Sequence, residues 1–202
     1  MKNPTSHFLW LEGPRVVADD INNPITVLAN RVIQLAEQTQ IPTISYRCEI
    51  RRGEPLKASN DSREAQASAG LVCALTRQMI ELLLPRFQAG VDLSERRFRV
   101  LDGCILSWSE LVGLFHDLLP LMPDTLLCII DGLHWLDDQS TTGCLEELVQ
   151  TLRGTKLRVL FTTTGRSTCL RQQLSADEIH RVETLDLKET NWSLDNDSLR
   201  AL

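Results

Sequence analysis

The sequence predicts a three-layer α/β/α fold with helices on both faces of a mostly parallel sheet. Apolar strands alternate with amphipathic helices along the chain, which is the order of strand–helix–strand units with right-handed crossovers. The run "TLLCIID" (125–131) is continuously apolar, as expected for a central strand that is covered on both faces. The chain has 202 residues, 43% of them hydrophobic, and is therefore long enough for one domain with a buried core.

The first strand and helix are marked by their ends. "HFLWLEGP" (7–14) is a short apolar run that ends in Gly-Pro, and it predicts a strand. After a polar segment, Asn23 is the expected N-cap and Pro24 the first residue of a helix that ends before Pro42. "TISYRCEI" (43–50) alternates apolar and polar residues, which is typical of a strand with one exposed face at the edge of a sheet.

The middle of the chain is predicted to contain a loop and two helices. Residues 51–64 are rich in Gly, Pro, Ser and charged side chains, so we expect a flexible loop. Apolar residues at helical spacing predict a helix over 62–84, which Pro85 stops. Ser107 and Glu110 form a capping box that predicts the start of another amphipathic helix.

The last third of the chain repeats the alternation. "STTGCLEELVQTLRG" (140–154) carries apolar residues at helical spacing. "KLRVLFTTTGRS" (156–167) predicts a second buried strand that ends in three threonines. A short helix and a final strand, "RVETLDL" (181–187), complete the predicted domain over 1–187, and residues 188–202 form a polar tail.

The composition excludes several functions. The formal net charge is −6, and no cluster of Lys and Arg could displace counterions from a nucleic-acid backbone, so we expect no nucleic-acid partner. The apolar runs are too short to span a bilayer and the N-terminus shows no signal peptide, so we expect no membrane contact and a cytoplasmic location. The six cysteines lack CxxC or Cys/His spacing, which favours buried reduced thiols over disulfides or a zinc site.

Distinctive residues mark the carboxyl ends of three predicted strands, which is where parallel sheets bind ligands. They are Gly13-Pro14 after the first strand, Asp131 after the central strand, and Thr162–Thr164 with Arg166 after the next. An acid in this place can hold Mg²⁺ through water, a neighbouring polar residue can sense a γ-phosphate, and the first loop can cradle phosphates. Together these positions outline a nucleoside triphosphatase site.

The segment "LLCIIDGLHWLDD" (126–138) resembles the Walker B segment of STAND-class P-loop NTPases, which include NACHT domains. In that family a hydrophobic strand is followed by Asp, then by Leu-His-Trp and a further Asp. "LRVLFTTTGRS" is similar to the family's sensor 1 strand, and "HFLWLEGP" leading into a helix stands in the place of Walker A. The order of elements matches over roughly residues 7–187 and resembles the large fungal set of such proteins.

The resemblance implies a P-loop fold whose five-stranded sheet has the order 5-1-4-3-2, with strand 43–50 at one edge. It also implies that Asp131 binds Mg²⁺ and that Asp137 positions a catalytic water. The residues implied to bind the nucleotide are Gly13, Pro14, Arg15, Thr163 and Arg166. Family members couple the domain to signalling through N-terminal effector and C-terminal repeat regions. This chain lacks both, so we expect a fragment, a truncated paralogue or a stand-alone module.

The segment in the place of Walker A departs from the family pattern. A working P-loop needs GxxxxGK[ST], in which glycines aim N–H groups at phosphate, Lys bridges the β and γ oxygens and Ser or Thr binds the metal. "GPRVVADDINNPIT" (13–26) keeps one Gly and lacks the second Gly, the Lys and the adjoining hydroxyl. Asp19 and Asp20 would each cost on the order of 4 kcal/mol against a phosphate about 4 Å away, and Val16-Val17 disfavour positive φ. We therefore expect weak or absent nucleotide binding.

The acids and Arg15 also have structural interpretations that the sequence leaves open. Asp131 could be a polar strand end bonded to neighbouring backbone. Asp137 or Asp138 could cap the helix that begins near Ser140. Arg15 could partly replace the missing lysine, although it lies at the wrong end of the loop.

The other candidates have structural alternatives as well. His134 and Trp135 follow a strand, and a His-Trp pair in that place is more often a packing contact than a catalytic one. Thr163 could sense the γ-phosphate, or it could be a β-branched residue that ends a strand. Arg166 could reach a γ-phosphate, but the sequence favours a solvated arginine in a turn.

The sequence favours a degenerate P-loop NTPase module that does not hydrolyse nucleotide, needs no cofactor, and serves as a structural or protein-interaction unit with protein partners. The alternative is a divergent ATPase or GTPase switch that uses Arg15, Asp131, Asp137 and Thr163 with Mg-ATP or Mg-GTP. A third possibility is an unrelated parallel α/β fold with a different ligand. Strand order tests the third, and nucleotide binding separates the first two.

Overall fold

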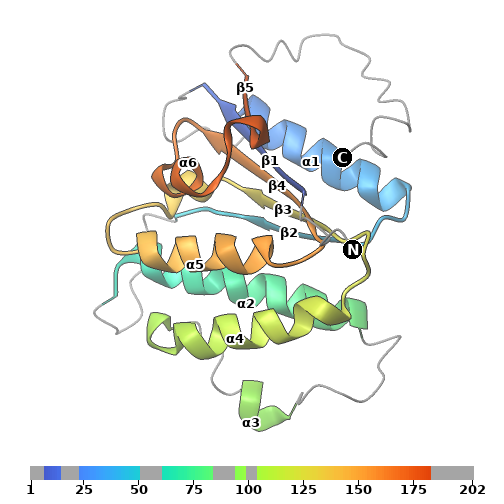
Figure 1. Ribbon diagram of the computed structural model, residues 1–202, viewed down its shortest axis with the longest axis vertical. Coiled ribbons are helices and arrows are strands. Elements are labelled where there is room, and N and C mark those ends of the chain that lie inside the picture. Colours follow the sequence, from blue (N-terminus) through green and yellow to red (C-terminus); the bar gives the residue numbers. More distant parts are fainter. Residues whose placement is uncertain (1–6, 15–22, 51–60, 84–93, 99–103, 183–202) are drawn as a thin grey trace.

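Five parallel strands form one sheet in the described part of the chain (Figure 1). The computed structural model describes residues 7–14, 23–50, 61–83, 94–98 and 104–182. The strands are β1 (His7–Gly13), β2 (Thr43–Arg47), β3 (Leu127–Asp131), β4 (Arg158–Thr164) and β5 (Ile179–Arg181). Their order is β2-β3-β4-β1-β5, which is the predicted order 5-1-4-3-2 read from the other edge. The predicted α/β fold class is therefore confirmed, with β2 at one edge.

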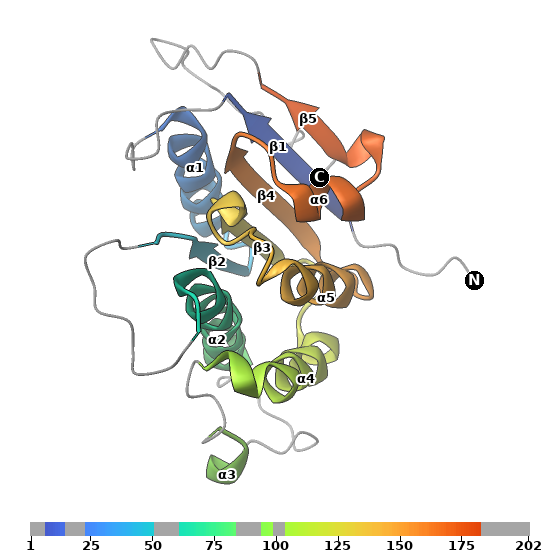
Figure 2. The same cartoon turned by 90° about the vertical axis from the view of Figure 1, so that its left-hand side faces the viewer.

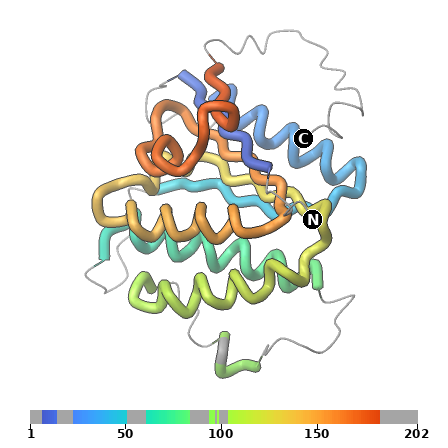
Figure 3. Tube along the Cα trace, in the orientation of Figure 1, coloured from blue at the N-terminus to red at the C-terminus, as the bar shows by residue number. Residues whose placement is uncertain are grey.

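Helices cover both faces of the sheet (Figures 1 and 2). Among the described helices, α1 lies alone on one face, while α2, α4 and α5 lie on the other and α6 sits beside α5. Their bounds are α1 (Pro24–Gln38), α2 (Arg63–Leu83), α3 (Glu95–Phe98), α4 (Trp108–Leu118), α5 (Thr142–Arg153) and α6 (Thr168–Gln173). The trace in Figure 3 passes from β1 through α1 to β2, and from β3 through α5 to β4.

The parallel register brings the carboxyl ends of neighbouring strands to one edge of the sheet. Gly13 on β1 lies opposite Thr164 on β4. Asp131 on β3 lies opposite Thr162 on β4 and Arg47 on β2. Gly13, Asp131 and the threonines at the end of β4 therefore lie at the same edge of the sheet, as expected for strands that all point the same way.

The hydrophobic core is divided unequally between the two faces. The larger part lies on the side of α2, α4 and α5 and includes the fully buried side chains Phe115 and Phe161. The part under α1 contains the buried residues Ala29, Ile129 and Leu160 with a few half-buried neighbours. Because apolar burial is the main favourable term in folding, α1 depends more than the other long helices on specific polar contacts.

Helix starts agree with the sequence at α1 and differ slightly at α2. Asn23 caps α1, since its Oδ1 accepts a hydrogen bond from Thr26 N at 2.9 Å, and Pro24 is the first helical residue. α2 begins at Arg63, so the end of the loop predicted over 51–64 belongs to the helix. Residues 51–60 of that loop lie outside the described part of the chain.

Two other predicted boundaries need correction. The capping box is wrong: Ser107 makes no side-chain cap hydrogen bond, because it ends a 3₁₀ turn that leads directly into α4. β5 begins at Ile179, before the predicted final strand 181–187, and residues 183–202 lie outside the described ranges. None of the described helices combines the length and the apolar character needed to cross a membrane.

Candidate functional site

Asp131 lies at the carboxyl end of β3 and is buried, with 6% of the residue exposed. Its Oδ1 accepts a hydrogen bond from Thr162 Oγ1 on β4 at 2.6 Å. Its Oδ2 accepts one from Thr26 Oγ1 on α1 at 2.8 Å. The carboxylate therefore binds side chains rather than the neighbouring backbone, and it joins three elements of the fold.

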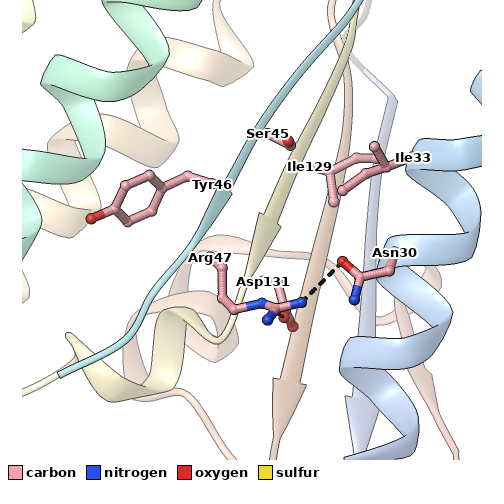
Figure 4. A pocket seen from close by; sticks show the side chains of 8 residues that line it. Asn30, Ile33, Ser45, Tyr46, Arg47, Ile129 and Asp131 are labelled. Carbon is pink, nitrogen blue, oxygen red and sulfur yellow. Dashed lines mark hydrogen bonds and ion pairs between the residues drawn. The ribbon is translucent and has the colours of Figure 1, made fainter. Parts of the chain in front are cut away.

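Arg47, at the end of β2, reaches across to the same carboxylate (Figure 4). Its Nε lies 3.6 Å from Asp131 Oδ2. Its Nη2 donates a hydrogen bond to Asn30 Oδ1 on α1 at 3.0 Å, and its Nη1 lies 3.6 Å from Glu49 Oε1. A buried carboxylate requires a compensating partner, and here the chain supplies a cation from its own edge strand.

A pocket of about 270 Å³ opens between α1 and β2 beside this ion pair. It has an apolar part and a polar part, formed by Ala29, Asn30, Ile33, Ser45, Tyr46, Arg47, Ile129 and Asp131. Figure 4 shows Ile33 and Ile129 close to each other, whereas the Tyr46 ring points away toward α2. The polar part of the pocket is the Arg47–Asp131 pair with Asn30.

Thr26 owes its position to the first turn of α1. The side-chain amide of Asn23 donates to Thr26 Oγ1 at 3.0 Å, and the same hydroxyl donates to Asp131. Sequence reasoning missed Thr26 because it sought a hydroxyl next to a lysine. The available signal was a Thr in the first turn of the helix that follows β1, two residues after the Pro of an Asn-Pro cap.

Gly13 ends β1 beneath this turn and is in close contact with Ile25. A Cβ atom at Gly13 would lie 2.3 Å from Ile25 Cγ1, so only glycine fits there without movement. Packing of the helix therefore accounts for the one glycine that the segment retains. Pro14 is exposed, and Arg15 lies outside the described residues together with the rest of the segment up to residue 22.

Two adjacent threonines of β4 have different partners. Thr162 contacts Asp131, whereas Thr163 Oγ1 accepts from Trp10 Nε1 at 2.9 Å and donates to Gly165 O at 2.7 Å. Thr163 is fully buried, and its hydroxyl already makes these two hydrogen bonds. Its role in nucleotide binding stays a prediction. Arg166 is exposed after β4, and its nucleotide contact likewise stays a prediction.

The acids after β3 stabilise two turns. Asp137 Oδ2 accepts from Ser167 Oγ at 2.7 Å and from Cys169 N at 3.0 Å, so it caps the start of α6. Asp138 Oδ1 accepts from Ser140 Oγ at 2.6 Å and Ser140 N at 2.7 Å, in the turn before α5. The side-chain hydrogen bond from Ser140 lowers the pKa of Asp138. Asp138 thus stabilises the turn before α5, whose N-cap residue is Thr141 and has no side-chain cap, so the predicted cap on that helix by either acid is wrong.

His134 lies in the turn after β3 and contacts the end of β4. Its Nε2 lies 3.0 Å from Thr164 Oγ1, and its ring lies 4.9 Å from that of Trp135. Within the described ranges its buried Nδ1 has no hydrogen-bond partner. Burial lowers the pKa of His134 to about 4, although the nearby Asp137 opposes the shift. The ring contact with Trp135 and the contact with Thr164 agree with the packing interpretation.

A second charged cluster, which the sequence did not suggest, lies at the carboxyl end of β1. The buried side chain of Glu12 has its Oε2 3.1 Å from Arg181 Nε and 3.5 Å from Arg171 Nη2. The two arginines come from β5 and α6. They compensate the buried carboxylate and link the last described elements to β1.

The groups around Asp131 do not fit a bound Mg²⁺ ion. Mg²⁺ requires near-octahedral oxygen ligands at about 2.1 Å. Both carboxylate oxygens accept hydrogen bonds from hydroxyls, and the Arg47 guanidinium shares Oδ2. A second cation on that oxygen would be repelled by the guanidinium. No group of three or more His, Cys, Asp or Glu side chains within the described ranges is arranged to hold a metal.

No protein-family model matches the sequence, and neither does any curated protein sequence. Among solved structures, the chain is similar to one chain of the structure of Drosophila ORC bound to AT-rich DNA and Cdc6. The identity is 8% and the TM-score 0.41, over 87% of this chain and 48% of that one. This chain therefore spans about half the length of its counterpart. The P-loop-like fold is supported here by the strand order and parallel register of the sheet itself.

Proposed function

We propose that this protein is a degenerate P-loop NTPase module of the STAND or NACHT kind and of fungal type. It does not hydrolyse nucleotide, and it acts in the cytoplasm as a structural or protein-interaction unit in signalling. The observation that carries the proposal is the state of Asp131, whose two carboxylate oxygens are engaged by Thr162, Thr26 and Arg47. The acid that would hold a metal over a nucleotide instead joins α1, β2, β3 and β4.

The first turn of α1 supports the same proposal. In the P-loop pattern the lysine directly precedes the hydroxyl that contacts the metal. Here Ile25 precedes Thr26, is 1% exposed and packs on Gly13. An apolar side chain cannot bridge phosphate oxygens, and the buried position would make a lysine there costly.

Thermal unfolding with and without nucleotide tests the proposal. Because a ligand that binds only the folded state raises the melting temperature, millimolar Mg-ATP or Mg-GTP should shift the Tm of this protein by less than about 1 °C. Nucleotide should shift the Tm of Asp131→Ala equally little. Asp124→Ala is the matched control, because it removes an exposed acid that pairs with Lys156, and its Tm should also stay unchanged with nucleotide. A rise of several degrees that Asp131→Ala abolishes and Asp124→Ala preserves would contradict the proposal.

A divergent Mg²⁺-dependent ATPase or GTPase switch is the second candidate, and one observation favours it. The Thr26 hydroxyl approaches Asp131 from the first turn of α1, as the Ser or Thr of a working P-loop approaches the metal. In that function Asp131 and Thr26 would share Mg²⁺. The nucleotide-dependent Tm shift described above is its distinguishing result.

A further inference from the structure

We propose that the Arg47 guanidinium is a built-in counter-ion that takes the place of a divalent cation at Asp131. Removing it would then create a site for Mg²⁺ or Mn²⁺ between α1, β2 and β3. This inference rests on the proposed function, because it explains how the acid of a degenerate site stays buried without a metal. It concerns a cation site that the native chain keeps closed.

The Arg47 guanidinium lies among three side chains that carry oxygen atoms. Its Nε faces Asp131 Oδ2 at 3.6 Å, its Nη1 faces Glu49 Oε1 at 3.6 Å, and its Nη2 donates to Asn30 Oδ1 at 3.0 Å. Each of its three nitrogens thus faces an oxygen from a different segment. Two carboxylates and an amide oxygen are the hard ligands that Mg²⁺ and Mn²⁺ prefer.

The charges are not balanced by Arg47 alone. One guanidinium faces the carboxylates of Asp131 and Glu49, which leaves one negative charge in excess. Asp131 is 9% exposed at its side chain and is therefore poorly screened by water, whereas Glu49 is 38% exposed. A divalent cation in the same place would neutralise both carboxylates, so the cluster without Arg47 has a stronger demand for such an ion than for a monovalent one.

The adjoining pocket supplies the room that a hydrated ion needs. Its volume of about 270 Å³ exceeds the share of liquid volume of one water, about 30 Å³, several times over. Ser45, Asn30 and Asp131 line it beside Arg47 (Figure 4). Waters in this space could complete the coordination of an ion held by the side-chain oxygens, because Mg²⁺ and Mn²⁺ commonly retain several waters.

Two variants test the proposal, with MnCl₂ as the probe. Arg47→Ala vacates the space, and Arg47→Gln removes the charge while keeping most of the side-chain volume. Without metal, both should melt below the native protein, because Asp131 loses its cation. Millimolar MnCl₂ should raise their Tm by at least about 2 °C, and electron paramagnetic resonance should show one bound Mn²⁺. The native protein should show neither effect.

The controls separate this site from the surface. Arg77→Gln removes an exposed arginine that pairs with Glu81 on α2, and it should gain no Mn²⁺ binding. The double variant Arg47→Gln/Asp131→Asn should lose the binding that Arg47→Gln gains. If Arg47→Ala does not fold, Arg47→Gln decides the outcome.

Two results would overturn the inference: folded Arg47→Gln that binds no Mn²⁺, or native protein that binds Mn²⁺ in a way that depends on Asp131. Neither result is the one that tests the proposed function, which fails when native protein is stabilised by Mg-ATP or Mg-GTP. Failure of the counter-ion inference and failure of the pseudo-NTPase proposal are therefore distinguishable.

Discussion

Asp131 and His134 lie three residues apart in the sequence, and their side chains differ in how many hydrogen-bond and ion-pair partners they have. The Asp131 carboxylate has two hydroxyl donors and a guanidinium. His134 has one contact at Nε2, to Thr164, while its buried Nδ1 is without a partner in the described part of the protein. An imidazole in such a place favours its neutral form, since burial disfavours the charged form more than the nearby Asp137 favours it.

This difference predicts a pH dependence of stability. Burial lowers the pKa of folded His134 from 6.5 to about 4, so the unfolded chain takes up a proton at a pH where the folded chain does not. The contribution of His134 is therefore present above pH 6.5 and is lost as the pH falls toward 4, by at most about 1.4 kcal/mol per pH unit. In His134→Gln this loss should be absent.

Urea unfolding at several pH values measures the effect. At pH 7.5 the difference in unfolding free energy between native protein and His134→Gln reflects packing and hydrogen bonding alone. Between pH 6.5 and 4.5 that difference should change in favour of the variant by roughly 1–2 kcal/mol, after a discount for partial exposure. If the difference in unfolding free energy stays constant across this pH range, the pKa of His134 is not lowered in the folded protein.

Single residues also show where sequence reasoning reached its limit. Asp131 could be predicted because an acid that ends an apolar run is a local signal. Thr26 and Arg47 could not be predicted as its partners, because the Thr26 contact spans 105 positions and the Arg47 contact depends on the β2–β3 register. Asp137 was visible as an acid, yet its cap on α6 depends on where Ser167 lies in three dimensions.

At the scale of elements, β2 shows how an edge strand is protected. Ser45 N donates to Gln78 Oε1 at 2.8 Å, and Gln78 Nε2 donates to Ser45 O at 2.8 Å. The side-chain amide of α2 therefore pairs with the free edge of β2 as a neighbouring strand would. Exposed strand edges promote pairing between chains, so this contact occupies the middle of a surface that would otherwise favour association.

Gln78→Ala should uncover this edge. We expect a loss of about 1–2 kcal/mol in unfolding free energy from two hydrogen bonds, and self-association that rises with concentration. Light scattering after size-exclusion chromatography measures the second effect. Arg77→Ala, which alters the exposed neighbour of Gln78, should leave the molecular mass unchanged; an unchanged mass for Gln78→Ala as well would show that the edge is harmless.

The edge position of β2 followed from its alternating sequence, because a period of two is a local property of a strand. The contact of Gln78 with the edge of β2 could not be predicted, because the sequence of a helix does not show which backbone groups its side-chain amides contact. The capping box at Ser107 failed for a related reason. The S-x-x-E pattern is present, but the preceding residues form a 3₁₀ turn, so the geometry that a cap requires does not arise there.

At the scale of the molecule, the two faces of the sheet differ in how they are held. The face under α2, α4 and α5 has a large continuous core, whereas the face under α1 has a small one. α1 is joined to the sheet by this small core and by polar contacts, in which Thr26 meets Asp131 and Asn30 meets Arg47. Strand–helix alternation predicted a mostly parallel sheet, and the resemblance to P-loop NTPases implied the strand order, but neither predicted this asymmetry.

Native-state hydrogen exchange should reveal the asymmetry as a separate opening of α1. Regions with few buried apolar contacts open at lower free energy than the core, so amides of α1 should be less protected than those of β3 and β4. Thr26→Ala removes a buried hydrogen bond to a carboxylate and should lower the opening free energy of α1 by about 1.5–3 kcal/mol. Thr151→Ala, which removes a hydroxyl contact within α5, should leave protection of α1 unchanged. Equal protection of α1 and β3 in both variants would mean that the sheet and all its helices open only together.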